Sequence, residues 1–348
     1  MKFRIHPTHL ISVPIQIALL IVSFILFALF LYKPITEFHP VNRKPVIYEL
    51  AKKDNADQKT VHIKVGLSIT DFLKFDALKN EFEINAIIWF VFNPAQVSQE
   101  TIEKFSFTKG TVTQKSNAIV TQIDAQTIKA LYFIRVEFST IPNYKRFPLD
   151  DHYLFLNLVN QEIQSEKVAF DIDPGEYTIS ENLYAAGWQI VEHDARAGYG
   201  KTEISEGHTL VQPKVSFSLG LSKQDYRQLL IIMLPLLLIF YCAIFAFSIK
   251  DLTLAVTLIL ASFSGLTAYS FVIQTVSPAV GYLMLCDYMF LLFLAATFVI
   301  FFIAILDATP EHIVSKKTLQ VTKGIAVIVI YIVIVAVWYY LTNIKDIY

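Results

Sequence analysis

Five long apolar runs stand out in this sequence of 348 residues. One lies near the start, at 10–32, and four follow one another towards the end, at 229–249, 252–276, 282–306 and 324–341. A helix of about 20 residues crosses the roughly 30 Å hydrocarbon core of a bilayer, and each run is close to that length. The pattern predicts an integral membrane protein with five spans.

The first run has two interpretations. Lys2 and Arg4 precede it, as in a secretory signal peptide. Its apolar stretch is longer than usual, however, and it ends at Tyr32 and Lys33 without a cleavage site of small residues. We therefore expect residues 1–40 to hold an uncleaved membrane anchor, with a signal peptide as the alternative.

Hydroxyl side chains share one side of the run at 252–276. On a helical wheel at about 100° per residue, five hydroxyl residues and two apolar residues fall within about 40° of one direction. These are Thr253, Thr257, Leu260, Ser264, Thr267, Phe271 and Thr275, whereas Ser262, Tyr269 and Ser270 fall elsewhere. The stripe predicts contact with water, as in a pore. Alternatively, these hydroxyls bond to their own backbone or to a neighbouring helix.

The region between the first run and the other four shows the two-residue alternation of β-strands. Strands are expected at 62–67, 81–91, 132–138, 153–159, 187–191 and 213–221. Asn93-Pro94, Pro142-Asn143 and Asp173-Pro174-Gly175 supply turns between them. We therefore expect an antiparallel β-sandwich at 42–225 and a membrane domain at 226–348. Residues 96–104 fit either a helix or a loop.

Composition removes several classes of function. A net charge of -1 gives no sign of nucleic-acid binding. The two cysteines, at 242 and 286, lie inside apolar runs, so neither a disulfide framework nor a metal site is predicted. No Gly-x-Ser-x-Gly or His-Glu-x-x-His motif is present, and no enzyme activity or cofactor is expected. Basic residues are divided so evenly between the two sides that they do not set the orientation.

Three motifs occur in a fixed order between residues 61 and 341. Phe147, Pro148 and Asp150 form a Phe-Pro-x-Asp loop, Pro235 interrupts the second apolar run, and 278–287 begins with proline and ends with aspartate. Their order resembles that of the pentameric ligand-gated ion channels (the Cys-loop receptor superfamily), and of the bacterial branch in particular. The segments 65–69 and 80–84 also look like the first two strands of that family's sandwich.

The resemblance implies a homopentamer in the plasma membrane that contacts membrane lipid, holds its β-sandwich outside or in the periplasm and conducts monovalent ions. The second of the last four spans would line the pore through Asp251, Thr253, Thr257, Leu260, Ala261, Ser264, Thr267, Ala268 and Phe271. Asp251 gives a weak preference for cations, although it fits a helix N-cap equally well. Ser264 stands where the family usually has its apolar gate, so either the gate has moved to Leu260 or Phe271 or the pore is unusual.

The resemblance also implies how a stimulus reaches the pore. The coupling residues would be Phe147, Pro148, Asp150, Lys223, Arg227 and Pro278, with Asp150 engaging Lys223 or Arg227. A small ligand would bind between subunits, near Tyr184, Trp188 and Tyr199. Protons acting on His152, His193 or His208 are the alternative stimulus.

The sequence departs from the family pattern in three respects. Thr140 and Leu154 replace the cysteines that bracket the loop, the segment before Phe147 is short, and the first apolar run is additional. Because a fold does not determine a function, a non-conducting membrane receptor or assembly subunit of the same fold is the rival hypothesis.

Overall fold

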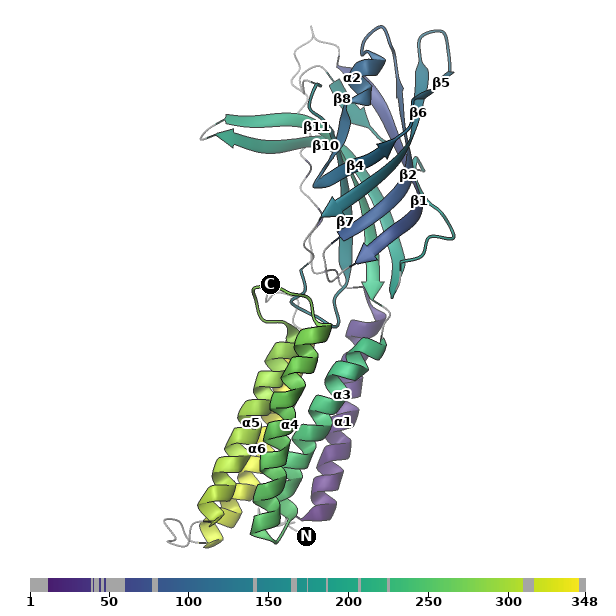
Figure 1. Cartoon of the computed structure of the whole chain (residues 1–348). Coiled ribbons are helices and arrows are strands. Elements are labelled where there is room, and N and C mark those ends of the chain that lie inside the picture. Colours follow the sequence, from purple (N-terminus) through teal and green to yellow (C-terminus); the bar gives the residue numbers. More distant parts are fainter. Residues whose placement is uncertain are drawn as a thin grey trace, which may run out of the picture. The chain divides into compact units, whose positions relative to one another are not determined.

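The computed structural model describes residues 12–38, 40, 44, 47, 60–76, 81–139, 143–163, 168–173, 175–185, 187–205, 208–223, 226–308 and 316–343. The chain forms two compact units (Figure 1). One contains Asn42–Asn143 and Asp151–Gln224 and is built from strands. The other contains Met1–Val41, Tyr144–Asp150 and Asp225–Tyr348 and is built from helices.

Among its described residues, the strand unit holds eleven strands and one short helix, α2 (Gln99–Glu103). The strands are β1 (Val61–Asp76), β2 (Glu81–Phe92), β3 (Phe105–Thr108), β4 (Gly110–Lys115), β5 (Ile119–Gln122), β6 (Ile128–Ser139), β7 (His152–Asn160), β8 (Val168–Asp171), β9 (Tyr177–Ile179), β10 (Trp188–Ser205) and β11 (His208–Lys223). Each of the six predicted strand segments overlaps one of the longer strands. The short strands β3, β4, β5, β8 and β9 were not predicted.

The strands form a sandwich-like sheet with the hydrogen-bonded order β10-β11-β7-β3-β4-β6-β2-β1-β8. Neighbouring strands are antiparallel, except that β1 pairs in parallel with β8 and β9. The two ends of this order approach each other, because the Tyr199 hydroxyl on β10 donates to the Val168 carbonyl on β8 at 3.4 Å. The enclosed core is rich in aromatic rings, including a stacked pair of Phe82 and Phe138 with centroids 4.7 Å apart.

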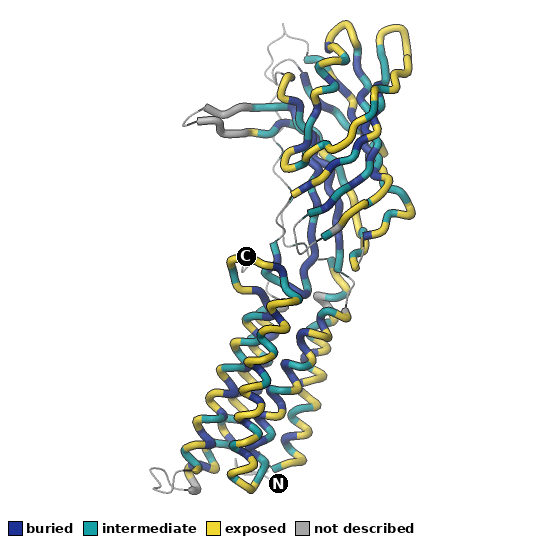
Figure 2. The backbone as a smooth tube through the Cα atoms, viewed as in Figure 1, coloured by how far each residue is buried: buried dark blue, intermediate teal, exposed yellow. Residues whose placement is uncertain are grey.

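Burial alternates strictly along β2 and β7, as the two-residue period of a strand with one face in a core requires (Figure 2). The open question at 96–104 is resolved in favour of a helix. Ser98 caps α2, its Oγ accepting from the Thr101 amide at 3.2 Å.

Gly66 is expected to be essential for packing in this unit. It pairs with Trp89, and a Cβ atom at position 66 would lie 2.2 Å from Trp89 Cε2. The indole cannot move freely, because its Nε1 donates to Glu176 Oε2 at 2.6 Å and Lys129 Nζ lies 4.7 Å from its centroid. We expect Gly66→Ala to destabilise the unit by about 1–3 kcal/mol, as overpacking commonly does. Thermal unfolding followed by tryptophan fluorescence measures the effect. Gly281→Ala, which has nothing within 4 Å of its Cβ position, is the control, and equal behaviour of the two variants would contradict the prediction.

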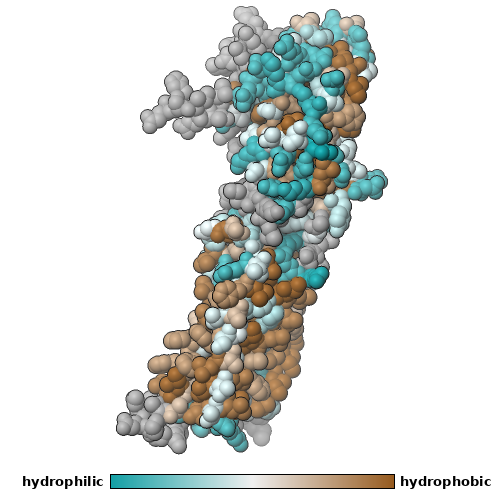
Figure 3. Space-filling model, viewed as in Figure 1, coloured by the Kyte–Doolittle hydropathy of each residue, from teal (hydrophilic) through white to brown (hydrophobic). Residues whose placement is uncertain are grey.

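The helical unit contains α1 (Val13–Thr36), α3 (Tyr226–Phe245), α4 (Leu252–Val276), α5 (Leu285–Ala308) and α6 (Lys316–Asn343). All five are long and apolar enough to cross a membrane. Their mean hydropathy is 2.5–3.0 except for α4, where it is 1.8. In Figure 3 the helical unit is largely brown, and a pale band runs along it where α4 lies in Figure 1. The least apolar span is therefore the one that carries the hydroxyl stripe.

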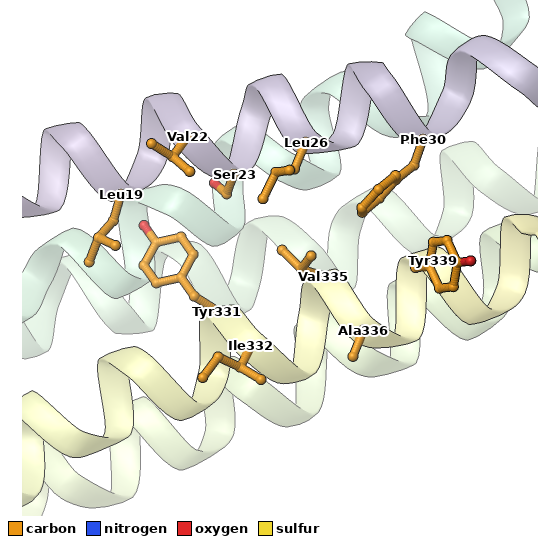
Figure 4. A pocket seen from close by; sticks show the side chains of 10 residues that line it. All are labelled: Leu19, Val22, Ser23, Leu26, Phe30, Tyr331, Ile332, Val335, Ala336 and Tyr339. Atoms are coloured by element: carbon orange, nitrogen blue, oxygen red, sulfur yellow. The ribbon is translucent and has the colours of Figure 1, made fainter.

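The first apolar run forms α1, which packs against α6 and α3. Phe27 meets Trp338 and Phe30 meets Tyr339, with ring centroids 5.4 and 5.3 Å apart. The buried Ser23 hydroxyl lies 2.7 Å from the Tyr241 hydroxyl. An open apolar groove with a volume of about 430 Å³ lies between α1 and α6 (Figure 4).

Candidate pore helix and coupling loop

Asp251 begins α4 as its N-cap. Its Oδ1 accepts from the amides of Thr253 and Leu254 at 2.9 and 3.2 Å, which satisfies two of the donors that a helix start leaves unpaired. The N-cap interpretation is thereby confirmed. Because Asp251 is also exposed, its carboxylate remains a candidate for an acidic ring, which stays a prediction.

The two sides of α4 have different environments. One side packs against the neighbouring helices and buries Ala255, Ile259, Ser262, Leu266 and Ile273. All nine residues expected to line a pore are exposed on the single chain. Among them Leu260 is 47% and Phe271 65% exposed. Within the described part of the chain, the hydroxyl face of α4 is thus left uncovered.

Three of the five hydroxyl groups of that face, those of Thr257, Thr267 and Thr275, bond to their own helix. Thr257 donates to the Thr253 carbonyl at 2.8 Å, and Thr267 donates to the Phe263 carbonyl at 3.0 Å. This is the bonding that the alternative interpretation expected. It does not exclude contact with water, because a hydroxyl that donates inward keeps its oxygen lone pairs for an outside donor.

The Phe-Pro-x-Asp loop belongs to the helical unit and accepts hydrogen bonds from the first residues of α5. The amides of Leu285 and Cys286 donate to the carbonyls of Lys145 and Phe147 at 3.0 and 3.3 Å. The first amides of a helix have no acceptor within it, so the loop supplies what α5 lacks. The Tyr144 amide also donates to the Tyr282 hydroxyl, at 2.8 Å, in the turn before α5.

Four predicted coupling residues are buried within this unit: Phe147, Pro148, Asp150 and Pro278. Phe147 is only 1% exposed and is part of the core formed by the long helices. Loop and bundle therefore share one hydrophobic core.

The two basic candidates occupy different units. The Lys223 amide donates to Asp151 Oδ1 at 3.1 Å, and its ammonium group lies 5.6 Å from the centroid of the Trp188 ring. Arg227 is exposed in the first turn of α3. The pairing of Asp150 with either base stays a prediction. Sequence reasoning missed Asp151, whose signal is a second acid directly after the motif.

The aromatic candidates for a ligand pocket have unlike surroundings. Tyr184 is exposed, whereas Tyr199 is buried. Trp188 lies between Lys223 and the buried His152, whose ring centroid is 5.3 Å away. A pocket between copies of the chain stays a prediction, as does proton sensing. The ring of His193 meets that of Tyr177 at 5.4 Å, and the side chain of His208 lies outside the described residues.

A charged cluster on β7 and β10 was not anticipated from the sequence. Tyr153 donates to Glu192, and Lys44 Nζ lies 3.4 Å from Asp194 Oδ2 and 4.9 Å from the centroid of the Tyr153 ring. Burial and the Glu192 carboxylate raise the pKa of Tyr153 to about 12. The cluster thus connects Lys44 to β7 and β10.

Comparison with known proteins gives one distant similarity. No family model matches the chain. The chain is 20% identical over 171 residues to the proton-gated ion channel of Gloeobacter violaceus, which covers 49% of this chain and 45% of that relative. The chain thus spans less than half the length of the relative that it matches. Together, the sandwich-like sheet and the five apolar helices among the described residues support a multi-pass membrane protein with a β-rich unit.

Proposed function

We propose that the chain is one subunit of a homopentameric, stimulus-gated channel in the plasma membrane. In this proposal α4 lines a pore for monovalent ions, and the strand unit lies outside the cell or in the periplasm. The observation that carries the proposal is the uncovered hydroxyl face of α4, on the least apolar of five candidate spans.

A polar face at membrane depth needs a polar neighbour, because lipid chains offer no hydrogen bonds. Closed cyclic symmetry lets five copies of α4 turn this face towards one axis and share a column of water. The rings of Thr257, Ser264 and Thr267 would replace part of an ion's hydration shell. Rings of Leu260 or Phe271 would close the path by excluding water.

Asp251 gives the proposal its weak preference for cations. Its carboxylate would form an acidic ring at the mouth of the pore, two residues before Thr253, while still capping α4. Asp251 is exposed and beside Lys250, which reduces the field of such a ring.

We propose protons as the first stimulus to test, because the relative is named as proton-gated. His152 is the main candidate, since it is buried against Trp188 at the start of β7, directly after the coupling loop. A small ligand at Tyr184, Trp188 and Tyr199 is the alternative stimulus.

Cysteine labelling tests the pore face directly. In a background without Cys242 and Cys286, we expect Thr257→Cys and Ser264→Cys to react with a charged, water-soluble thiol reagent in membranes. Ser262 is buried on the opposite side of α4, so Ser262→Cys should stay unreacted. Ser270→Cys should react slowly. Reaction rates measured by mass spectrometry check this. Equal labelling at all four positions would rule out the assignment of the pore face.

Planar-bilayer recording of the purified protein over a pH and salt series tests conduction itself. Single-channel steps that depend on pH support the channel. A pentamer that labels on the pore face but stays silent at every pH points to another ligand. A silent protein whose α4 face does not label supports the non-conducting rival.

A further inference from the structure

The proline in α3 leaves one backbone carbonyl without its usual partner. Pro235 lies inside the helix and has no amide hydrogen, so it cannot donate to the carbonyl of Ile231 four residues earlier. An unpaired carbonyl is costly within a bilayer.

Tyr269 on α4 supplies the missing donor. Its hydroxyl donates to the Ile231 carbonyl, thirty-eight positions away in the sequence. On the helical wheel Tyr269 lies about 160° from Thr253, almost opposite the hydroxyl face. The bond therefore holds α4 from behind the face that is proposed to line the pore.

Two further contacts place Tyr269 within a continuous seam between α3 and α4. Gln228 Nε2 donates to the Val276 carbonyl at 3.1 Å, on the side towards the end of α4. On the other side, a Cβ atom at Gly265 would lie 3.5 Å from Ile239 Cγ2, so the two helices are closely packed there. These contacts follow one antiparallel register, with Tyr269 between them.

We propose that Tyr269 is a positioning residue for the pore. By satisfying the carbonyl that Pro235 frees, its hydroxyl fixes the rotation of α4 about its axis and thereby selects which side chains form the pore face. The inference rests on the proposed channel function for its consequence, whereas the contact between Tyr269 and Ile231 can be tested without any conduction.

A double-mutant cycle isolates the contact. Tyr269→Phe removes the donor and leaves the carbonyl unpaired, so we expect a lower midpoint of thermal unfolding in lipid nanodiscs. Pro235→Ala gives residue 235 an amide that can donate to Ile231. In that background Tyr269→Phe should therefore lower the midpoint by no more than about a third of the shift that it causes when Pro235 is present. Tyr288→Phe, whose hydroxyl bonds to no described residue, is the matched control and should leave the midpoint unchanged.

Thiol labelling measures the rotation of α4 about its axis. In the cysteine background described above, we expect Tyr269→Phe to raise the labelling rate of Ser262→Cys on the order of tenfold and to slow that of Ser264→Cys, because a contact worth one hydrogen bond no longer holds α4. Adding Pro235→Ala should largely restore the original rates. If the Tyr269 side chain only filled space, the effect of Tyr269→Phe on the labelling rates would not depend on residue 235.

The outcomes separate this inference from the proposed function. Equal shifts of the unfolding midpoint with and without Pro235→Ala overturn the role of Tyr269, whatever the labelling shows. Failure of Ser264→Cys to label in the presence of Tyr269, with a non-additive cycle, overturns the pore assignment and leaves the contact established. If Pro235→Ala does not yield folded protein, Pro235→Leu supplies the same amide for the cycle.

Discussion

Phe271→Ala is expected to open the proposed channel in the absence of a stimulus. Phe271 is 65% exposed on the hydroxyl face of α4, so five copies would form a ring of phenyl groups around the pore axis. Large apolar rings close a pore by expelling water, and alanine removes most of that apolar bulk. We expect the open probability at rest to rise about tenfold or more, which corresponds to about 1.4 kcal/mol in the equilibrium between closed and open states. Planar-bilayer recording at a pH where the unsubstituted channel is closed measures this.

Two other substitutions on α4 make the test specific. Phe263→Ala removes the same side chain from the same helix, about 80° around the helix from Phe271, and it should leave the open probability at rest unchanged. Leu260→Ala tests the other gate candidate, which is 47% exposed. Opening by Leu260→Ala alone would place the gate there. If neither Phe271→Ala nor Leu260→Ala changes conduction, the hypothesis of an apolar gate on this face is wrong.

The strands that were predicted from the sequence are the long ones, in which a pattern of β-forming residues can be recognised. In β2, twelve residues alternate between buried and half-buried positions without a break, and polar and apolar residues alternate in the sequence over its first half, Glu81–Ala86. The four residues of β8 carry no such signal. β8 exists because Val168–Asp171 pairs with β1, a partner about a hundred residues earlier in the chain. Short strands of this kind depend on distant pairing, which periodicity within a window cannot reveal.

The same distinction applies to the candidate site. The exposed face of α4 follows from the helical spacing of Thr253, Thr257 and Ser264, which is a local property. The role of Tyr269 depends on a carbonyl in another helix, and its position off the stripe gave no signal of its own. Likewise, the Phe-Pro-x-Asp motif predicted coupling, but it did not predict that the carbonyls of Lys145 and Phe147 would accept hydrogen bonds from the first amides of α5.

Helix α1 has the contacts of a specifically packed helix rather than of a passive anchor. Ser23, Phe27 and Phe30 lie along one side and meet Tyr241, Trp338 and Tyr339 in turn. The other side, including Phe24, is exposed. A signal peptide that is removed after export has no need of such matched partners, whereas a helix that stays with the bundle gains from them.

Phe27→Ala is therefore expected to destabilise the purified protein strongly, while Phe24→Ala is not. Phe27 is 5% exposed and packs edge-on against Trp338, so truncation leaves a cavity and removes the ring contact. Truncating a buried phenylalanine commonly costs about 3–5 kcal/mol. Phe24, three residues earlier and 47% exposed, loses only contact with lipid. Thermal unfolding in nanodiscs compares the variants, and intact mass shows whether residues 1–40 are present. If α1 is cleaved, both variants yield the same mature protein with the same stability. If α1 is retained but both variants behave alike, it is a passive anchor whose packing against α6 contributes little.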